Sequence, residues 1–246
     1  IVDTWTNITM ASTLDLDGDK GEVVSLNTFN NEVFCFQKQG FSNILFNSRV
    51  QIPTSDGMPI ELSNGLKVNG KRYISNTIGC NNKWSIAETP SGLYFIDNIT
   101  NSIYLFNGKI NSLSDKLGFR QWVGENNSLD NWDPVEFKNF VTYYDKVNGD
   151  VFFISKDECL AFSEPLGQFT SFYSYEHMPY FANLEDRGIA FNTDKGGTVY
   201  KAWLHNEGEY NMFFNKYCPF YTTVIANPDM AVDKIFNNLE FRADSW

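Results

Sequence analysis

The chain has 246 residues, enough for one large β domain or two small ones, and 16% of them are aromatic. Its formal net charge of −11 argues against nucleic-acid binding, which needs clustered Lys and Arg, and against binding an anionic membrane surface. No apolar run approaches the roughly 20 residues that span a bilayer, and no signal peptide is visible. We therefore expect an acidic β protein with no membrane insertion and no specific nucleic-acid binding.

The dominant pattern along the chain is a recurring β-hairpin, in which two short apolar or aromatic runs flank Asn, Asp or Gly residues. Asn-Gly tolerates positive φ at both central positions of a tight turn, so Asn148-Gly149 is the clearest of these turns. The predicted hairpins span residues 23–36, 93–106, 141–154 and 189–203, the last turning at residues 194–197, and a shorter one is expected within 62–73, through Asn64-Gly65 or Asn69-Gly70.

Other segments complete this outline. Residues 159–162 and 169–173 are expected to add a third and a fourth strand to the hairpin at 141–154, although residues 155–164 also allow one or two helical turns. Residues 124–134 are expected to form a long exposed loop, and residues 229–237 a short helix.

The spacing of the hairpins suggests repeated units. They begin at Val23, Leu93, Val141 and Ile189, at intervals of 70, 48 and 48 residues. A period of 40–50 residues with several strands per unit is typical of a β-propeller, whose neighbouring sheets bury one another's faces. We predict an all-β fold of repeated antiparallel hairpins resembling propeller blades over residues 1–227, with residues 228–246 opening a further segment. An incomplete propeller or a β-sandwich remains an alternative.

The sharpest local motif is acidic. Asp15, Asp17 and Asp19 alternate along the chain and can point oxygen atoms at one Ca²⁺ ion. An EF-hand loop needs Gly at its sixth position and Glu at its twelfth, where this chain has Lys20 and Leu26. The preferred interpretation is an acidic turn before the first hairpin, with calcium binding as the alternative.

A second group of acids suggests glycan chemistry. Asp130, Asp133 and Glu136 lie close together beside Trp122 and Trp132, which can stack on a sugar. Glycoside hydrolysis needs two carboxyl groups at a fixed separation, which a sequence does not show. Because a chain with 30 acidic residues produces such clusters by chance, we expect no enzyme activity, no catalytic residue and no cofactor.

The remaining reactive residues show no catalytic or metal-binding motif. The four cysteines, Cys35, Cys80, Cys159 and Cys218, are widely spaced without a CxxC pair, so buried free thiols are expected. His177, within an aromatic stretch, is expected to be packed or hydrogen-bonded, and neither it nor His205 completes a zinc pattern.

Several segments of the sequence resemble virion proteins of crAss-like bacteriophages. The first begins Tyr143-Tyr144-Asp145-Lys146-Val147-Asn148-Gly149-Asp150-Val151-Phe152-Phe153 and continues through residues 159–164 and 168–175. Residues 228–230, 233–236 and 240–242 are similar as well. These blocks resemble the muzzle, or stabilisation, proteins of the short tail, and they carry no active site.

The resemblance implies a structural virion protein, assembled in the bacterial host cytoplasm and placed in a nozzle-like ring at the distal end of the tail. Its implied partners are copies of itself and other tail ring proteins. Chains of that family are longer than this one, and we expect a piece of such a protein, since the sequence begins at Ile1 and stops soon after a strand-like run at 238–242. The alternative function is a carbohydrate-binding or glycan-cleaving propeller at the host surface.

Overall fold

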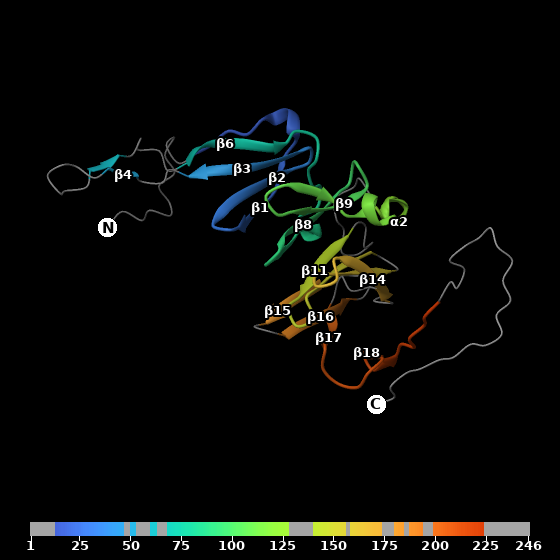
Figure 1. The fold of residues 1–246 in the computed structure, drawn as a ribbon. Helices are drawn as coiled ribbons and strands as arrows, with labels where there is room; N and C mark the ends of the chain where they lie inside the picture. The colour runs from blue at the N-terminus through green and yellow to red at the C-terminus, as the bar shows by residue number, and fades with distance from the viewer. Residues whose placement is uncertain are drawn as a thin grey trace. The chain divides into compact units, whose positions relative to one another are not determined.

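The computed structural model describes residues 13–46, 50–52, 60–62, 68–127, 140–155, 158–173, 180–184, 187–193 and 199–223. The chain divides into two compact units, Ile1–Gly208 and Glu209–Trp246. Nearly all regular structure in the described ranges is antiparallel β-sheet (Figure 1). The all-β prediction is therefore confirmed.

Four sheets follow one another along the first unit, and each is a meander in which sequential strands pair, apart from an insertion in the first sheet. The first sheet consists of β1 (Val23–Phe29), β2 (Glu32–Gln37), β3 (Gly40–Phe46) and β6 (Val68–Ser75). The second consists of β7 (Ala87–Thr89), β8 (Gly92–Asp97), β9 (Ser102–Phe106) and β10 (Ile110–Ser112). The third consists of β11 (Val141–Asp145), β12 (Asp150–Ile154), β13 (Cys159–Ser163) and β14 (Gln168–Tyr173). The fourth has three strands, β15 (Tyr180–Leu184), β16 (Arg187–Thr193) and β17 (Val199–Leu204).

Smaller elements lie between and after the sheets. Strands β4 (Val50–Ile52) and β5 (Ile60–Leu62) pair between β3 and β6, and two short 3₁₀ helices are η2 (Gly18–Lys20) and η3 (Lys83–Ser85). Helices α1 (Ser114–Leu117) and α2 (Arg120–Asn126) follow the second sheet. In the second unit, β18 (Met212–Phe213) pairs with β19 (Lys216–Tyr217).

The second sheet is buried on both faces, and its sequence explains why. Along β8, alternate side chains point to opposite faces of the sheet. Leu93 and Phe95 join a cluster with aromatic side chains of the first sheet, whereas Tyr94 and Ile96 join a cluster with the third sheet. An uninterrupted apolar run is therefore the signature of a strand between two layers.

Aromatic rings dominate the first of these interfaces. Phe36 and Phe41 of the first sheet lie with ring centroids 4.5 Å apart, and Phe36 meets Phe95 of the second sheet edge to face at 5.0 Å. Such pairs stabilise a core beyond the area they bury. The high Phe and Tyr content therefore serves the contacts between sheets.

The predicted strands at 159–162 and 169–173 are confirmed as β13 and β14, so the helical alternative at 155–164 is wrong for that segment. The hairpin turn at Asn148-Gly149 is confirmed, with Gly149 at φ 71°. The turn expected at 194–197 lies outside the described residues, between the paired strands β16 and β17.

The hairpin predicted within 62–73 is wrong. Leu62 pairs with Val50, and Tyr73 pairs with Ser42, because β5 and β6 belong to different sheets. Asn69-Gly70 lies inside β6 rather than in a turn, while Asn64-Gly65 lies outside the described residues. The loop predicted at 124–134 is also partly wrong, because Gly124–Asn126 form the end of α2; its later residues lie within 128–139, outside the described part. The helix predicted at 229–237 lies outside the described part as well.

Candidate functional site

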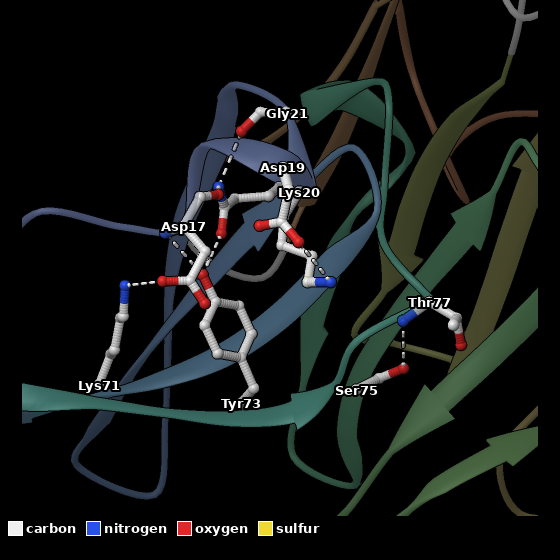
Figure 2. A network of polar contacts seen from close by, with 9 residues as sticks. Asp17, Asp19, Lys20, Gly21, Lys71, Tyr73, Ser75 and Thr77 are labelled. Atoms are coloured by element: carbon white, nitrogen blue, oxygen red, sulfur yellow. Dashed lines mark hydrogen bonds and ion pairs between the residues drawn. The ribbon is translucent and has the colours of Figure 1, made fainter.

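The acidic turn of residues 13–22 covers one face of the first sheet, and Figure 2 shows its contacts. The Gln37 side chain donates to the carbonyl oxygens of Asp17 (3.0 Å) and Gly21 (2.7 Å) and accepts a bond from the Tyr73 hydroxyl (2.7 Å). The same hydroxyl accepts a bond from the Asp17 backbone amide at 3.1 Å. The turn is therefore fixed to β2 and β6 by a buried glutamine.

A lysine lies where the calcium hypothesis would place a cation. The Lys71 ammonium donates to the Asp17 carboxylate (Figure 2) and, at 2.9 Å, to the Asp15 carbonyl oxygen. This contact raises the pKa of Lys71 above its ordinary value, and the Asp17 hydrogen bond is the main cause. Asp19 instead pairs with Lys20 at 3.2 Å. In the described ranges, no group of three His, Cys, Asp or Glu side chains is placed to hold a metal ion.

Of the residues proposed for glycan chemistry, only Trp122 lies in the described part. Its indole nitrogen donates to Glu158 at 2.6 Å, and its ring packs against Phe140 with centroids 5.5 Å apart. Trp122 thus contributes to the core beside α2. Asp130, Trp132, Asp133 and Glu136 fall within residues 128–139, outside the described ranges.

His205 lies at the interface of the third and fourth sheets, while His177 lies outside the described residues. The His205 ring meets Tyr143, Phe152 and Phe181 edge to face, and its Nε2 lies 3.7 Å from Asp145 Oδ2. Burial lowers the pKa of His205, and the nearby Asp145 charge opposes this. The geometry is that of a packed histidine.

Asp145 is 1% exposed and well supplied with donors. It accepts bonds from the Val147 backbone amide (3.0 Å) and from the side chains of Asn148 (2.8 Å) and Asn206 (2.9 Å). These bonds close the β11–β12 turn and attach it to the residue after His205. A buried carboxylate with this many donors serves structure.

The cysteines are all free thiols, which confirms the expected pairing state. Cys35, Cys80 and Cys159 are buried as predicted, whereas Cys218 is partly exposed, so the expected burial is wrong for that residue. Burial raises the pKa of Cys80 to about 11 and that of Cys159 well above its ordinary value. Because the thiolate is the reactive form, these buried thiols are poor nucleophiles.

The structure reveals a cavity that the sequence did not indicate. It has a volume of about 640 Å³ and is lined by the four asparagines Asn81, Asn98, Asn101 and Asn127 together with residues of the β2–β3 turn and α2. The only sign of it in the sequence was the polar run at 98–101, which we interpreted as a hairpin turn and not as part of a binding site. The lining comes from four separate segments, which no local motif connects.

One face of the fourth sheet is mainly apolar and exposed, with Arg187, opposite Leu184, at its edge. The strand register aligns Ala182, Ile189 and Leu204 across the three strands, with Phe191 and Ala202 in the next row of the same face. Leu184 and Leu204 are 60% and 37% exposed. The opposite face packs on the third sheet, where the Phe181 and Tyr143 rings stack at 4.5 Å and Gly188 leaves room for the Tyr143 hydroxyl.

These features define an all-β protein of antiparallel sheets that bury one another's faces through aromatic side chains. The chain belongs to the Crassvirus muzzle protein family: the model of that family matches residues 1–194, and the model of the Crassvirus muzzle protein C-terminal domain matches residues 208–246. The chain is 66% identical over 245 residues to the muzzle protein of Bacteroides phage crAss001, and it spans 17% of the length of that relative. The resemblance found in the sequence is therefore confirmed.

Solved structures show only distant likeness. The extracellular domain of the putative one component system BT4673 from B. thetaiotaomicron aligns at a TM-score of 0.36 and 12% identity, covering 69% of this chain and 20% of that one. The AfRom2 CNH domain aligns at a TM-score of 0.32 and 10% identity, covering 82% and 75% respectively. In the described ranges, no helix is long and apolar enough to cross a membrane.

Proposed function

We propose that this chain is part of a structural, non-catalytic virion protein in a ring at the distal end of a short phage tail. The observation that carries the proposal is membership of the muzzle family, supported by 66% identity to a protein named as a muzzle protein. The chain acts in the virion through contacts with copies of the same protein and with neighbouring tail rings. Assembly takes place in the cytoplasm of the bacterial host.

The packing of the sheets supports a propeller-like arc. The first strands of successive sheets contact one another in series, β1 with β7, β7 with β11, and β11 with β15. In a propeller, one strand of each blade lines the central axis in this way. The polar turn fixed by Gln37 covers the outer face of the first sheet, much as a terminal cap ends a row of stacked repeats. We infer an incomplete propeller that ends within the first compact unit, by residue 208, with residues 209–246, which match the C-terminal domain model, belonging to a following segment.

The open apolar face of the fourth sheet supports an assembly role. Among the described residues, β17 pairs only with β16, and this sheet has one strand fewer than the other three. The relative is about six times longer than this chain, so much of the protein lies outside it. The occupant that we propose for this face is a further sheet of the same protein, which continues the stacking seen at the other interfaces.

Labelling of virions tests the proposed location. An antibody raised against the 246-residue chain should bind one end of the tail in electron micrographs of purified virions, with the capsid unlabelled. Labelling of the capsid, or detection of the protein only in infected cells and not in virions, would contradict the proposal.

Substitution on the fourth sheet tests the proposed contact. Leu184→Lys with Leu204→Lys should leave the melting temperature of the 246-residue chain nearly unchanged, because both side chains are exposed. In the whole protein the same pair should prevent incorporation into virions, because it would bury two unpaired charges. Leu166→Lys with Val147→Lys, at exposed turn positions, is the matched control. Normal incorporation of the first pair would exclude this face as a contact.

A further inference from the structure

The asparagine-lined cavity has a lining of unusual chemistry. Lys38 and Gln39 of the β2–β3 turn lie on one side, and Gly124 of α2 and the β8–β9 turn lie on the others. Its volume of about 640 Å³ falls in the range of small-ligand sites, roughly 300–1,000 Å³. Five of the eight lining residues carry carboxamide groups, and no carboxylate is among them.

Hydrogen bonds hold these amides in fixed positions. Asn98 Nδ2 donates to Asn127 Oδ1 at 2.6 Å, and Asn127 Nδ2 donates to the Asn98 carbonyl (2.8 Å) and to Asn101 Oδ1 (2.5 Å). The backbone amide of Asn81 donates to Asn98 Oδ1 at 3.2 Å. A ligand that meets an already ordered surface loses less side-chain entropy on binding.

The site carries little net charge. The ammonium of Lys38, the only charged residue of the lining, pairs with Glu22 at 2.8 Å. Both N–H groups of Asn127 are used within this network, so the lining offers a ligand the Gln39 carboxamide, Asn101 Nδ2 and the second lone pair of the Asn101 and Asn127 oxygens. These donors and acceptors match sugar hydroxyl groups, which also donate and accept. Ile99, 49% exposed at the cavity, adds an apolar surface for the C–H face of a sugar ring.

From this arrangement we propose that the cavity binds a neutral oligosaccharide. The chemistry disfavours anionic glycans, because the lining has one cation and it is already paired. The inference goes beyond the structural role proposed above and does not depend on it, since a tail protein can carry a sugar site whether or not it forms a ring.

Saturation-transfer NMR on the 246-residue chain tests the site with defined probes: maltotriose, mannotriose, diacetylchitobiose and, as the anionic comparison, sialyllactose. We expect saturable binding of at least one neutral probe, with weaker or no transfer to sialyllactose. The side-chain amide signals of Asn98, Asn101 and Asn127 should shift during the same titration. No binding of any neutral probe, or preferred binding of sialyllactose, would overturn the proposal.

A substitution that fills the cavity tests whether the sugar binds there or elsewhere on the surface. Gly124 lies in α2, and a Cβ atom there would meet the Asn101 side chain at an ordinary 3.6 Å, so Gly124→Tyr introduces a ring without a backbone clash. It should weaken binding at least tenfold. Gln121→Tyr, on the same helix but outside the lining, should leave binding unchanged. Equal affinity in both variants would show that the sugar binds elsewhere. If Gly124→Tyr lowers the melting temperature, the amide shifts of Asn98, Asn101 and Asn127 in the unaltered chain show instead whether the sugar binds in the cavity.

Discussion

At the scale of single residues, the contact between Lys71 and Asp17 favours a structural role for the acidic turn over a calcium site. An alternating row of aspartates suggests a cation site, and the structure supplies a cation from the protein itself. The sequence did not indicate this, because Lys71 is 54 residues from Asp17 and reaches it only through the pairing of β3 with β6.

We predict that calcium leaves the stability of the chain unchanged. Millimolar Ca²⁺ must displace the Lys71 ammonium from Asp17 before it can bind there, so the melting temperature should not rise. Lys71→Met should lower the free energy of unfolding by about 1 kcal/mol or less, because the pair is partly exposed. Differential scanning fluorimetry measures both effects, with Lys116→Met as the control. A rise of several degrees with Ca²⁺, lost in Asp17→Ala, would restore the metal site.

His205 should make the protein less stable in mild acid. Burial lowers its pKa in the folded state below the ordinary value of about 6.5, so the unfolded chain binds the proton more readily. The stability that neutral His205 contributes should therefore be fully present above pH 7. The free energy of unfolding should fall as the pH drops through 6.5 toward the folded-state pKa of His205. The titratable groups that face this ring are Asp145, whose charge moderates the effect, and Tyr143.

The measurement is the slope of unfolding free energy against pH between 5.5 and 7, compared with that of His205→Gln. The variant should lose stability at neutral pH but show a flatter slope, because His177 then remains as the only histidine. An unchanged slope would mean that His205 does not titrate in this range.

At the scale of strands and sheets, the local patterns of the sequence predicted much of the fold. The run at 93–96 and the turn at 148–149 follow from burial and turn chemistry, and both are found in the structure. The equal spacing of hairpins was misleading, because Val141 begins the first strand of its sheet whereas Ile189 lies in a second strand. The first strands actually begin at Val23, Ala87, Val141 and Tyr180, at unequal intervals.

The errors have a common physical cause. Strand β7 has three residues, too few to show alternation, and α1 and α2 are so short that contacts with β9, rather than helical periodicity, stabilise them. The asparagine cavity was missed for a related reason. Its residues lie between positions 38 and 127, and only the stacking of the first two sheets and α2 brings them together.

A glutamate joins the second and third sheets, and its loss should destabilise the stack. Thr89 donates to Glu164 Oε1 at 2.7 Å, and the same carboxylate lies close enough to Tyr94 and Tyr144 to raise the pKa of both hydroxyls, after burial. The pKa of Tyr94 is raised, by burial first and then by the Glu164 charge. Glu164→Gln should lower the free energy of unfolding by about 1–3 kcal/mol, as expected for weakened bonds to a charged group.

Urea denaturation measures this change. Glu125→Gln, at an exposed position on α2, is the control and should change stability by less than about 0.5 kcal/mol. Equal effects of the two substitutions would show that Glu164 does not connect the sheets energetically.

At the scale of the whole molecule, charge should set the state of the isolated chain. A net charge of −11 on each copy opposes self-association, and the exposed apolar side chains of the fourth sheet are one surface that could offset it. We predict a monomer or weak oligomer in light scattering at physiological salt. A tight ring of six or more copies that persists at high salt would show that these 246 residues suffice for assembly.

The same acidity should let DNA pass without binding. Five basic side chains in the described ranges pair with acids: Lys20 with Asp19, Lys38 with Glu22, Lys71 with Asp17, Arg120 with Asp115 and Arg187 with Glu207. Affinity for duplex DNA comes mainly from unneutralised Lys and Arg that displace counterions, and each pairing removes one such group. Gel-shift assays at physiological salt should therefore detect no binding at micromolar chain. Sub-micromolar binding that weakens steeply with salt would reveal a basic surface and contradict a wall that DNA slides past.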